Sequence, residues 1–227
     1  MPYNIENENS IYNNYLNQVF NKINTTFISQ DYFGINEKYI RCPLCKIYNY
    51  DFNIFYYLKF SIKKVNNYLV NKLGEYMNNP IKKKRTIQIL NNNYEKLITL
   101  DDCFEYYFRT VSEDYKCSKC NKISAQAEKK NIIKKFPNIL CIIIEETEDY
   151  NISVLMQQKY KIENDIKNYE LIRAIIYSNN DKKYYTISKG EVNPEYFLLD
   201  VNNYESYSLS EGQKMGSPVM LLYKAIN

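Results

Sequence analysis

The sequence predicts an α+β protein in which antiparallel sheet predominates. Three observations support this class. Apolar and polar residues alternate in short stretches, most regularly from Phe52 to Ile62, as they do in strands. A helical period of apolar residues is clear in two stretches, residues 10–24 and 99–108. In the second half of the chain, short apolar segments follow one another as in a meander of strands.

Composition limits the functions open to this chain. Its 227 residues, 45% of them hydrophobic, suffice for one domain with a buried core, and a net charge of +4 does not indicate a nucleic-acid or membrane-surface protein. No apolar run could span a bilayer and no signal peptide opens the chain, so we expect a cytoplasmic or nuclear protein without a membrane partner. There is no histidine, which excludes Ser-His-Asp and Cys-His catalysis and His-ligated metals.

The first 62 residues predict one helix and one long strand. Ile11, Tyr15, Val19 and Ile23 recur every four residues and give the helix an apolar face. Residues 33–35 end this pattern, and residues 39–41 lead into the first CxxC pair. The even positions between residues 52 and 62 are all apolar, which predicts a single strand.

Residues 63–85 predict an exposed basic insertion with a short helix near Val65–Met77. The insertion ends in a basic run, namely Lys82, Lys83, Lys84 and Arg85. Such a run could contact nucleic acid or anionic lipid, although a solvated loop is the more ordinary interpretation.

The remaining elements follow from local signals. Residues 86–90 are strand-like, and Thr99 with Asp102 forms a capping box that opens a helix through Phe108. Five further strands are expected at Ala125–Ile133, Ile139–Ile144, Tyr169–Tyr177, Tyr184–Ile187 and Val219–Tyr223, and a sixth at Tyr196–Asp200.

Four of the six cysteines form two CxxC pairs, Cys42 with Cys45 and Cys117 with Cys120. A CxxC turn points both sulfurs at one ion, and two such turns complete a tetrahedral thiolate site. In a reducing compartment this set favours one structural zinc ion over disulfides. The two turns must then come from distant segments that meet at the end of a hairpin array. Cys103 and Cys141 lie in apolar surroundings and are expected to be buried thiols.

Seven motifs in a fixed order carry a family resemblance. They are Phe33-Gly34-Ile35, the first CxxC pair, Leu100–Phe108, Tyr115–Cys120, Phe136–Leu140, Tyr169–Leu171 with Ala174–Ile176, and Pro218–Lys224. Together they resemble the ubiquitin-specific protease (USP) family, the C19 ubiquitin carboxyl-terminal hydrolases, from about residue 10 to residue 224. The resemblance implies a papain-like fold with an antiparallel palm sheet and zinc-tipped fingers.

The resemblance also implies domain boundaries. Residues 1–35 would be a remnant of the family's thumb, residues 36–132 the fingers with the four-cysteine site and the insertion at 63–85, and residues 133–227 the palm. The family's nucleophile lies in a cysteine box far upstream of the first CxxC pair. Only about 40 residues precede Cys42 and none is cysteine, so we expect most of the thumb to be missing.

The family's catalytic triad is degenerate in this chain. Lys183 stands where the family has its general-base histidine, whereas Asp200 matches the family's acid. A lysine holds its proton too tightly to replace imidazole near neutral pH. We therefore expect no peptidase activity.

Three functions remain open at this point. The chain could be a non-hydrolytic USP-like domain that binds ubiquitin, a ubiquitin-like protein or another protein partner. It could be a structural subunit of a larger assembly, in which the basic run at residues 82–85 contacts RNA or a neighbouring protein. It could also be the C-terminal part of a split deubiquitinase.

Overall fold

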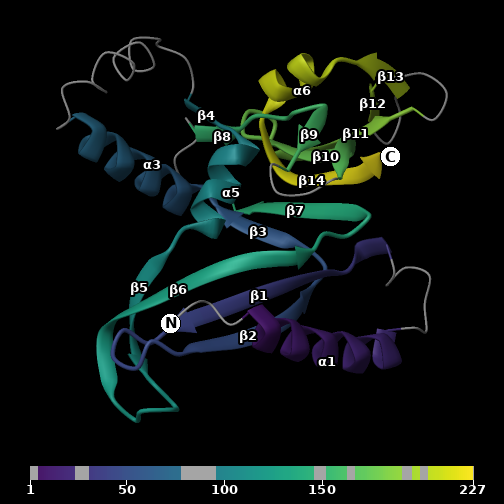
Figure 1. Cartoon of the computed structure of the whole chain (residues 1–227). Helices are drawn as coiled ribbons and strands as arrows, with labels where there is room; N and C mark the ends of the chain where they lie inside the picture. The colour runs from purple at the N-terminus through teal and green to yellow at the C-terminus, as the bar shows by residue number, and fades with distance from the viewer. Residues whose placement is uncertain are drawn as a thin grey trace. The chain divides into compact units, whose positions relative to one another are not determined.

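The protein is described by a computed structural model that covers residues 5–23, 31–77, 96–145, 152–162, 167–190, 196–199 and 204–226. The chain divides into two compact units (Figure 1). The first unit comprises Met1–Tyr57 and Tyr107–Leu140, and the second comprises Leu58–Tyr106 and Cys141–Asn227. Both units combine helices with mostly antiparallel sheet, so the predicted α+β class is confirmed.

The first unit is built on an antiparallel sheet of four strands in the order β2-β1-β6-β5. The strands are β1 (Gly34–Arg41), β2 (Tyr48–Phe55), β5 (Val111–Lys116) and β6 (Ile123–Lys135). β1 and β6 form the central pair, and a short turn joins each of them to an edge strand. One CxxC pair lies in each turn, which places both pairs at the same end of the sheet.

Helix α1 (Ile5–Ile23) packs along this sheet (Figure 1). The rings of Tyr12 and Tyr15 lie against the ring of Phe52, with centroid separations of 5.4 and 5.6 Å. The helix thereby covers a small buried cluster that consists of Phe33, Ile35 and Phe52. The predicted amphipathic helix is confirmed, and it begins several residues earlier than expected.

The single long strand expected from Phe52 to Ile62 is wrong. The chain leaves the first sheet after Phe55, and β3 (Leu58–Ser61) belongs to the sheet of the second unit. Ile62 is already the first residue of a helix. The link between the two strands is exposed, with Tyr56 at 49% of its full accessibility. The alternation of apolar residues therefore comes from two separate strands that each bury one face.

The second unit is built on a sheet of eight strands. Seven follow the order β13-β12-β11-β10-β14-β7-β3, and β9 pairs with the start of β10. Besides β3, these strands are β7 (Ile139–Glu145), β9 (Lys159–Lys161), β10 (Asn168–Ser178), β11 (Lys183–Lys189), β12 (Tyr196–Leu199), β13 (Tyr204–Tyr207) and β14 (Ser217–Ile226). The strands from β10 to β13 pair antiparallel, whereas β3 and β7 pair in parallel.

Helices and a second small sheet are also found in the described part of this unit. They are α3 (Ile62–Met77), α5 (Leu100–Phe108), α6 (Leu209–Met215) and the parallel pair β4 (Lys96–Ile98) and β8 (Ile152–Val154). The expected capping box opens α5: the Thr99 amide donates to the Asp102 carboxylate at 2.9 Å, and the Asp102 amide donates to the Thr99 hydroxyl at 3.2 Å. The helix expected near residues 65–77 is confirmed as α3.

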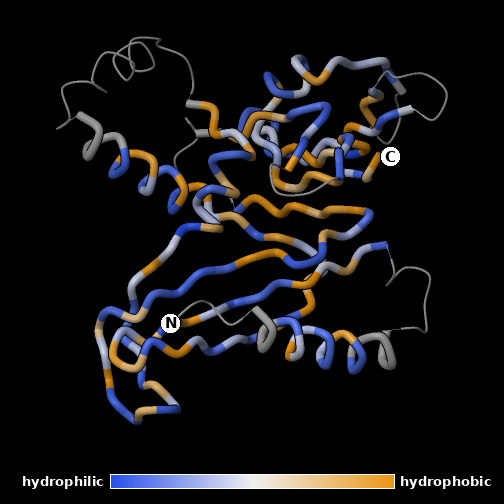
Figure 2. Tube along the Cα trace, in the orientation of Figure 1, coloured by the Kyte–Doolittle hydropathy of each residue, from blue (hydrophilic) through white to orange (hydrophobic). Residues whose placement is uncertain are grey.

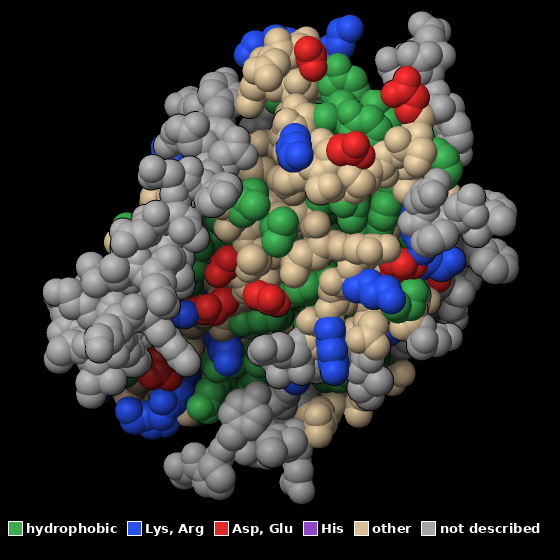
Figure 3. Space-filling model, turned by 90° about the horizontal axis from the view of Figure 1, so that it is seen from above, with side chains coloured by type: hydrophobic (Ala, Val, Ile, Leu, Met, Phe, Trp, Pro, Cys, Tyr) green, Lys and Arg blue, Asp and Glu red, His purple; other side chains and the backbone are tan. Residues whose placement is uncertain are grey.

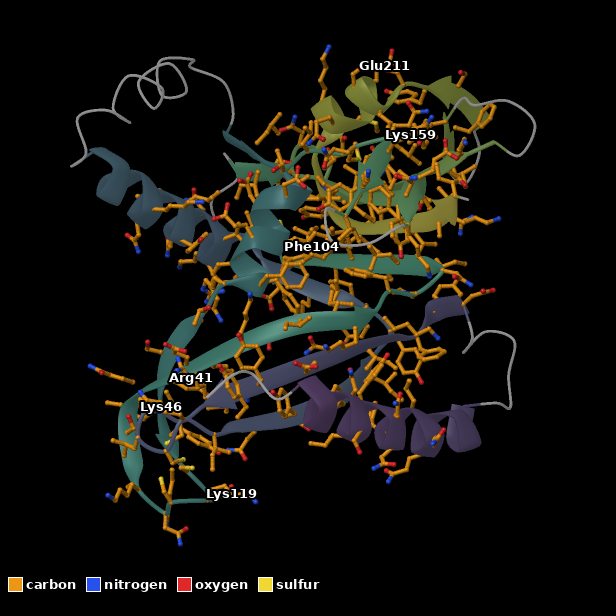
Figure 4. The ribbon with its side chains drawn as sticks, in the orientation of Figure 1. Arg41, Lys46, Phe104, Lys119, Lys159 and Glu211 are labelled. Atoms are coloured by element: carbon orange, nitrogen blue, oxygen red, sulfur yellow. The ribbon has the colours of Figure 1, made fainter. Side chains whose placement is uncertain are left out.

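Aromatic side chains line the core of the second unit. The ring of Phe104, which is labelled in Figure 4, lies 5.6 Å from the ring of Phe60 and 5.6 Å from that of Tyr160. Tyr160 in turn lies 6.5 Å from Tyr223, which is fully buried. Strand β7 contributes a nearly continuous apolar run (Figure 2), as its sequence predicts. The strands expected around β6, β10, β11, β12 and β14 are also confirmed.

Some expectations find no counterpart in the described residues. The strand expected at residues 86–90 and the basic run Lys82–Arg85 lie outside them.

No described helix is both long and apolar enough to cross a membrane. On the face drawn in Figure 3, acidic and basic side chains are interspersed among hydrophobic ones, so this face shows no block of one charge.

Candidate metal centre

Each CxxC pair lies in a tight turn of the first unit, which we call a knuckle. In the first knuckle, the Lys46 amide donates to the Cys42 carbonyl at 2.9 Å, and the Cys42 amide donates to the Ile47 carbonyl at 3.0 Å. The second knuckle repeats both bonds at 2.9 and 3.0 Å with Asn121, Cys117 and Lys122. The two turns therefore have the same backbone geometry, although they come from segments far apart in the sequence.

The residue that follows each second cysteine has a left-handed backbone. Lys46 has φ of 62° and Asn121 has φ of 54°. This conformation turns the chain sharply enough for both sulfurs of a pair to face the same point. Asparagine tolerates it well, whereas a lysine there is strained by about 1 kcal/mol. The knuckle geometry therefore overrides the local preference at Lys46.

The four sulfurs of the two knuckles form one cluster. Cys42 Sγ lies 3.9 Å from Cys120 Sγ, and Cys45 Sγ lies 3.7 Å from Cys117 Sγ. All four sulfurs lie within 4.8 Å of one another. Four sulfurs placed tetrahedrally at about 2.3 Å from a zinc ion are separated by about 3.8 Å. The cluster therefore has the donor atoms and nearly the dimensions of a four-thiolate zinc site.

As free thiols, Cys117 and Cys45 have pKa values displaced in opposite directions. Hydrogen bonds from the backbone amides of Cys120 and Lys119 lower the pKa of the Cys117 thiol to about 6. The Ile47 amide lowers the pKa of the Cys45 thiol, but burial and the neighbouring sulfurs outweigh it and raise that pKa to about 11. Four thiolates this close repel one another, and a divalent cation among them removes that repulsion.

The arrangement fits a closed, structural metal site. Cys42 and Cys117 are fully buried, and four protein ligands fill a tetrahedral ion's coordination shell. Such a site leaves no position for substrate or water. The predicted ligands Cys42, Cys45, Cys117 and Cys120 are thus brought together, and within the described residues this is the one group of side chains found that could hold a metal ion.

A further contact near the knuckles was not predicted. The side chain of Asn49 on β2 donates to the hydroxyl of Tyr115 on β5. These strands are the two edges of the sheet, so the sheet must curl where the knuckles meet. No sequence signal identifies this pair, because its partners are joined only by the folded sheet.

Of the two triad positions expected from the family resemblance, only Lys183 lies within the described residues. Lys183 is the first residue of β11, is exposed, and lies opposite Ser178 of β10 in the strand register. Asp200 follows β12 immediately and lies outside the described residues. The match of Lys183 and Asp200 to the family's histidine and acid thus stays a prediction.

The other two cysteines are buried, as the sequence predicts. Cys103 is fully inaccessible, and burial raises the pKa of its thiol to about 12. Burial also raises the pKa of the Cys141 thiol, which is 7% exposed. Neither thiol is accessible or acidic enough to serve as a nucleophile at neutral pH.

Comparison with known proteins identifies the fold. No family model matches the sequence, and no curated protein matches it. The structure aligns with a SAGA DUB (deubiquitinase) module of Ubp8, Sgf11, Sus1 and Sgf73 bound to monoubiquitin, with a TM-score of 0.61 and 17% identity over 95% of this chain and 48% of that one. A yeast SAGA DUB module with a variant Sgf73 gives a TM-score of 0.63 and 18% identity over 93% of this chain and 45% of that one.

At these identities the likeness shows the fold and no more. The chain has a mixed α+β fold that resembles the USP-family deubiquitinase Ubp8. It spans about half the length of the chains it matches. The expected USP-like fold is therefore supported.

Proposed function

We propose that this chain is a catalytically inactive USP-like domain that binds ubiquitin, a ubiquitin-like protein or another protein partner. The observation that carries the proposal is the fold shared with Ubp8 over more than nine-tenths of this chain, in a structure that contains bound monoubiquitin. The four-cysteine cluster adds support, because a structural zinc ion would fix the knuckle ends of the four-stranded sheet.

The proposal of inactivity rests on the side chains that this chain offers. It has no histidine to act as general base. An exposed lysine, Lys183, stands where the family resemblance expects that histidine. Four of its six cysteines lie in the cluster that could hold a metal ion, and Cys103 and Cys141 are buried thiols of raised pKa. A retained acid at Asp200 has no imidazole to orient.

Two alternatives stand beside this proposal. The matched structures contain Sgf11, Sus1 and Sgf73 as well as Ubp8, which favours a structural subunit of a larger assembly. Such an assembly could include RNA held by Lys82–Arg85. The other alternative is the C-terminal part of a split deubiquitinase; the chain spans about half the length of the matched chains.

Further assignments belong to the same proposal. Residues 1–35 would be a remnant of the thumb, residues 36–132 the fingers and residues 133–227 the palm. The four cysteines would hold one zinc ion. The protein would act in the cytoplasm or the nucleus.

A titration with ubiquitin tests the proposal. Isotope-labelled ubiquitin is titrated with the zinc-loaded chain and followed by NMR. The titration is repeated with the Cys120→Ser variant, which lacks one of the four proposed zinc ligands. Saturable shifts are expected with the parent chain and with the control variant Cys141→Ala, but not with Cys120→Ser, which would lose the zinc.

A ubiquitin electrophile probe tests the proposed inactivity. No covalent adduct is expected, and labelling of any cysteine would overturn the proposal that the chain is catalytically inactive.

A further inference from the structure

The ends of the two knuckles form one surface, which we call the fingertip and define as residues 42–47 and 116–123. The two turns lie next to each other, with sulfur–sulfur separations of 3.7 and 3.9 Å, and a zinc ion bound to all four sulfurs would join them. Backbone hydrogen bonds close each turn at 2.9 and 3.0 Å. Side chains that project from these turns are therefore presented on a rigid support, which lowers the entropy lost when a partner binds them.

The fingertip exposes three large aliphatic side chains. Leu44 is 53% exposed, Ile47 is 41% exposed and Ile123 is 73% exposed. Ile123 is the most exposed of the large hydrophobic side chains in the described residues. One exposed leucine or isoleucine needs no explanation, but three on two adjoining turns are more than single scattered residues account for.

The same turns carry only positive charge. Their ionisable side chains other than cysteine are the four exposed lysines Lys46, Lys116, Lys119 and Lys122. Within the described residues, none of these lysines forms an ion pair with a carboxylate. In Figure 4, Lys46 and Lys119 lie on either side of the sulfur cluster at the end of the hairpins. By contrast, Arg41 just inside the fingertip pairs with Glu128 at 3.0 Å.

A simple explanation accounts for part of this charge. A zinc ion with four thiolates carries a net charge of −2, and nearby lysines would offset it. Four lysines exceed that charge by two, so the fingertip stays positive when the metal is bound. The offset also leaves the three exposed aliphatic side chains unexplained.

We propose that the fingertip docks an acidic protein segment that also carries apolar side chains. The lysines would pair with its carboxylates, and Leu44, Ile47 and Ile123 would lose water-exposed area against its apolar side chains. Single-stranded nucleic acid is a poorer fit, because its binding uses aromatic platforms and the knuckles expose none. Binding of the acidic segment and binding of ubiquitin are measured with separate ligands, so the two proposals can fail separately.

A labelled peptide of four Asp-Leu-Glu-Ile repeats is the first probe, followed by fluorescence anisotropy with the zinc-loaded chain. A peptide of four Asp-Ser-Glu-Ser repeats has the same charge without the apolar side chains. The first peptide should bind at least about tenfold more tightly than the second, with an affinity that falls as salt is raised. No binding of the first peptide, or equal binding of both, would overturn the proposal.

Paired variants locate the binding surface. Lys119→Glu with Lys122→Glu should weaken binding of the first peptide about tenfold or more, whereas the same reversal at Lys214 and Lys224 of the second unit should not. Ile123→Ser should weaken it as well. Because these side chains are exposed, zinc content and thermal unfolding should stay unchanged.

Two other probes exclude the competing partners. A single-stranded oligouridine and vesicles of phosphatidylcholine with phosphatidylserine are measured with the same fingertip variants. Weak binding of both, relative to the first peptide, supports the proposal. Tighter binding of the RNA or of the vesicles, lost in the Lys119→Glu, Lys122→Glu variant, would assign the fingertip to that partner and overturn the proposal.

Discussion

Loss of the metal should unfold the knuckle end of the first unit and leave its other end folded. The apolar cluster of Phe33, Ile35 and Phe52 lies where α1 packs on the sheet. At the knuckle end, the buried side chains among the described residues are Cys42 and Cys117, with few apolar side chains beside them. Structural zinc in small peptide domains contributes about 10–16 kcal/mol of binding free energy, which is comparable with the whole stability of a domain.

The amides of Lys46 and Asn121 report on this end directly. Each donates to a cysteine carbonyl at 2.9 Å, so each should be protected from hydrogen exchange only while its knuckle is closed. Cys42→Ser should lower zinc from one ion per chain to almost none, and exchange at both amides should accelerate by several orders of magnitude. Lowering the pH should also release the zinc and lower the protection factors of both amides, since the ligands bind metal only as thiolates.

A matched variant separates ligand loss from loss of any cysteine. Cys141→Ala removes a buried thiol from the second unit and should leave the zinc content unchanged. Zinc is measured by elemental analysis and exchange by NMR or mass spectrometry. If Cys42→Ser retains zinc, or if the metal-free parent keeps both amides protected, the cluster is not a structural metal site and this reasoning is refuted.

Three further predictions concern the second unit. Thr99→Ala removes the cap of α5 and should lower the free energy of unfolding by about 1 kcal/mol in a denaturant titration; no change would show that the cap is not needed. Gly216→Ala should cost about 2 kcal/mol or more in the same assay, because a Cβ there would meet the Tyr177 carbonyl oxygen at 2.1 Å, and an unchanged stability would refute so close an approach. Hydrogen bonds from the Ser208 hydroxyl and amide hold the pKa of the Glu211 carboxyl below its usual 4.5. These bonds therefore stabilise α6 fully above pH 4.5, and the stabilisation is lost as the pH falls through the lowered pKa of Glu211. The protection factors of the α6 amides, which correct for the intrinsic pH dependence of exchange, should therefore fall at low pH in the parent chain and should not show that fall in Glu211→Gln.

Local chemistry made part of this structure predictable. The two CxxC pairs identified the cluster because a CxxC turn determines the direction of both its sulfurs. The capping box of Thr99 and Asp102 marked the start of α5, because these two side chains satisfy backbone amides at a helix N-terminus. Helix α6 was overlooked although Ser208 and Glu211 form a capping box of the same kind, so a signal for it was present in the sequence.

Features that depend on tertiary structure could not be read from the sequence. The break between β2 and β3 leaves the apolar alternation intact, because both strands bury the same parity of residues in different sheets. The left-handed backbone of Lys46 has no signal of its own, since lysine does not favour it. The bond from Asn49 to Tyr115 exists only because the sheet curls at the knuckles.

The central claim is that this chain binds ubiquitin or a related protein without cleaving its conjugates. Calorimetric titration of the zinc-loaded chain with monoubiquitin tests that claim most directly. The account predicts saturable binding with about one ubiquitin per chain, retained in Cys141→Ala and lost in Cys120→Ser. No heat of binding at high micromolar ubiquitin would contradict it and would leave the structural-subunit alternative in its place.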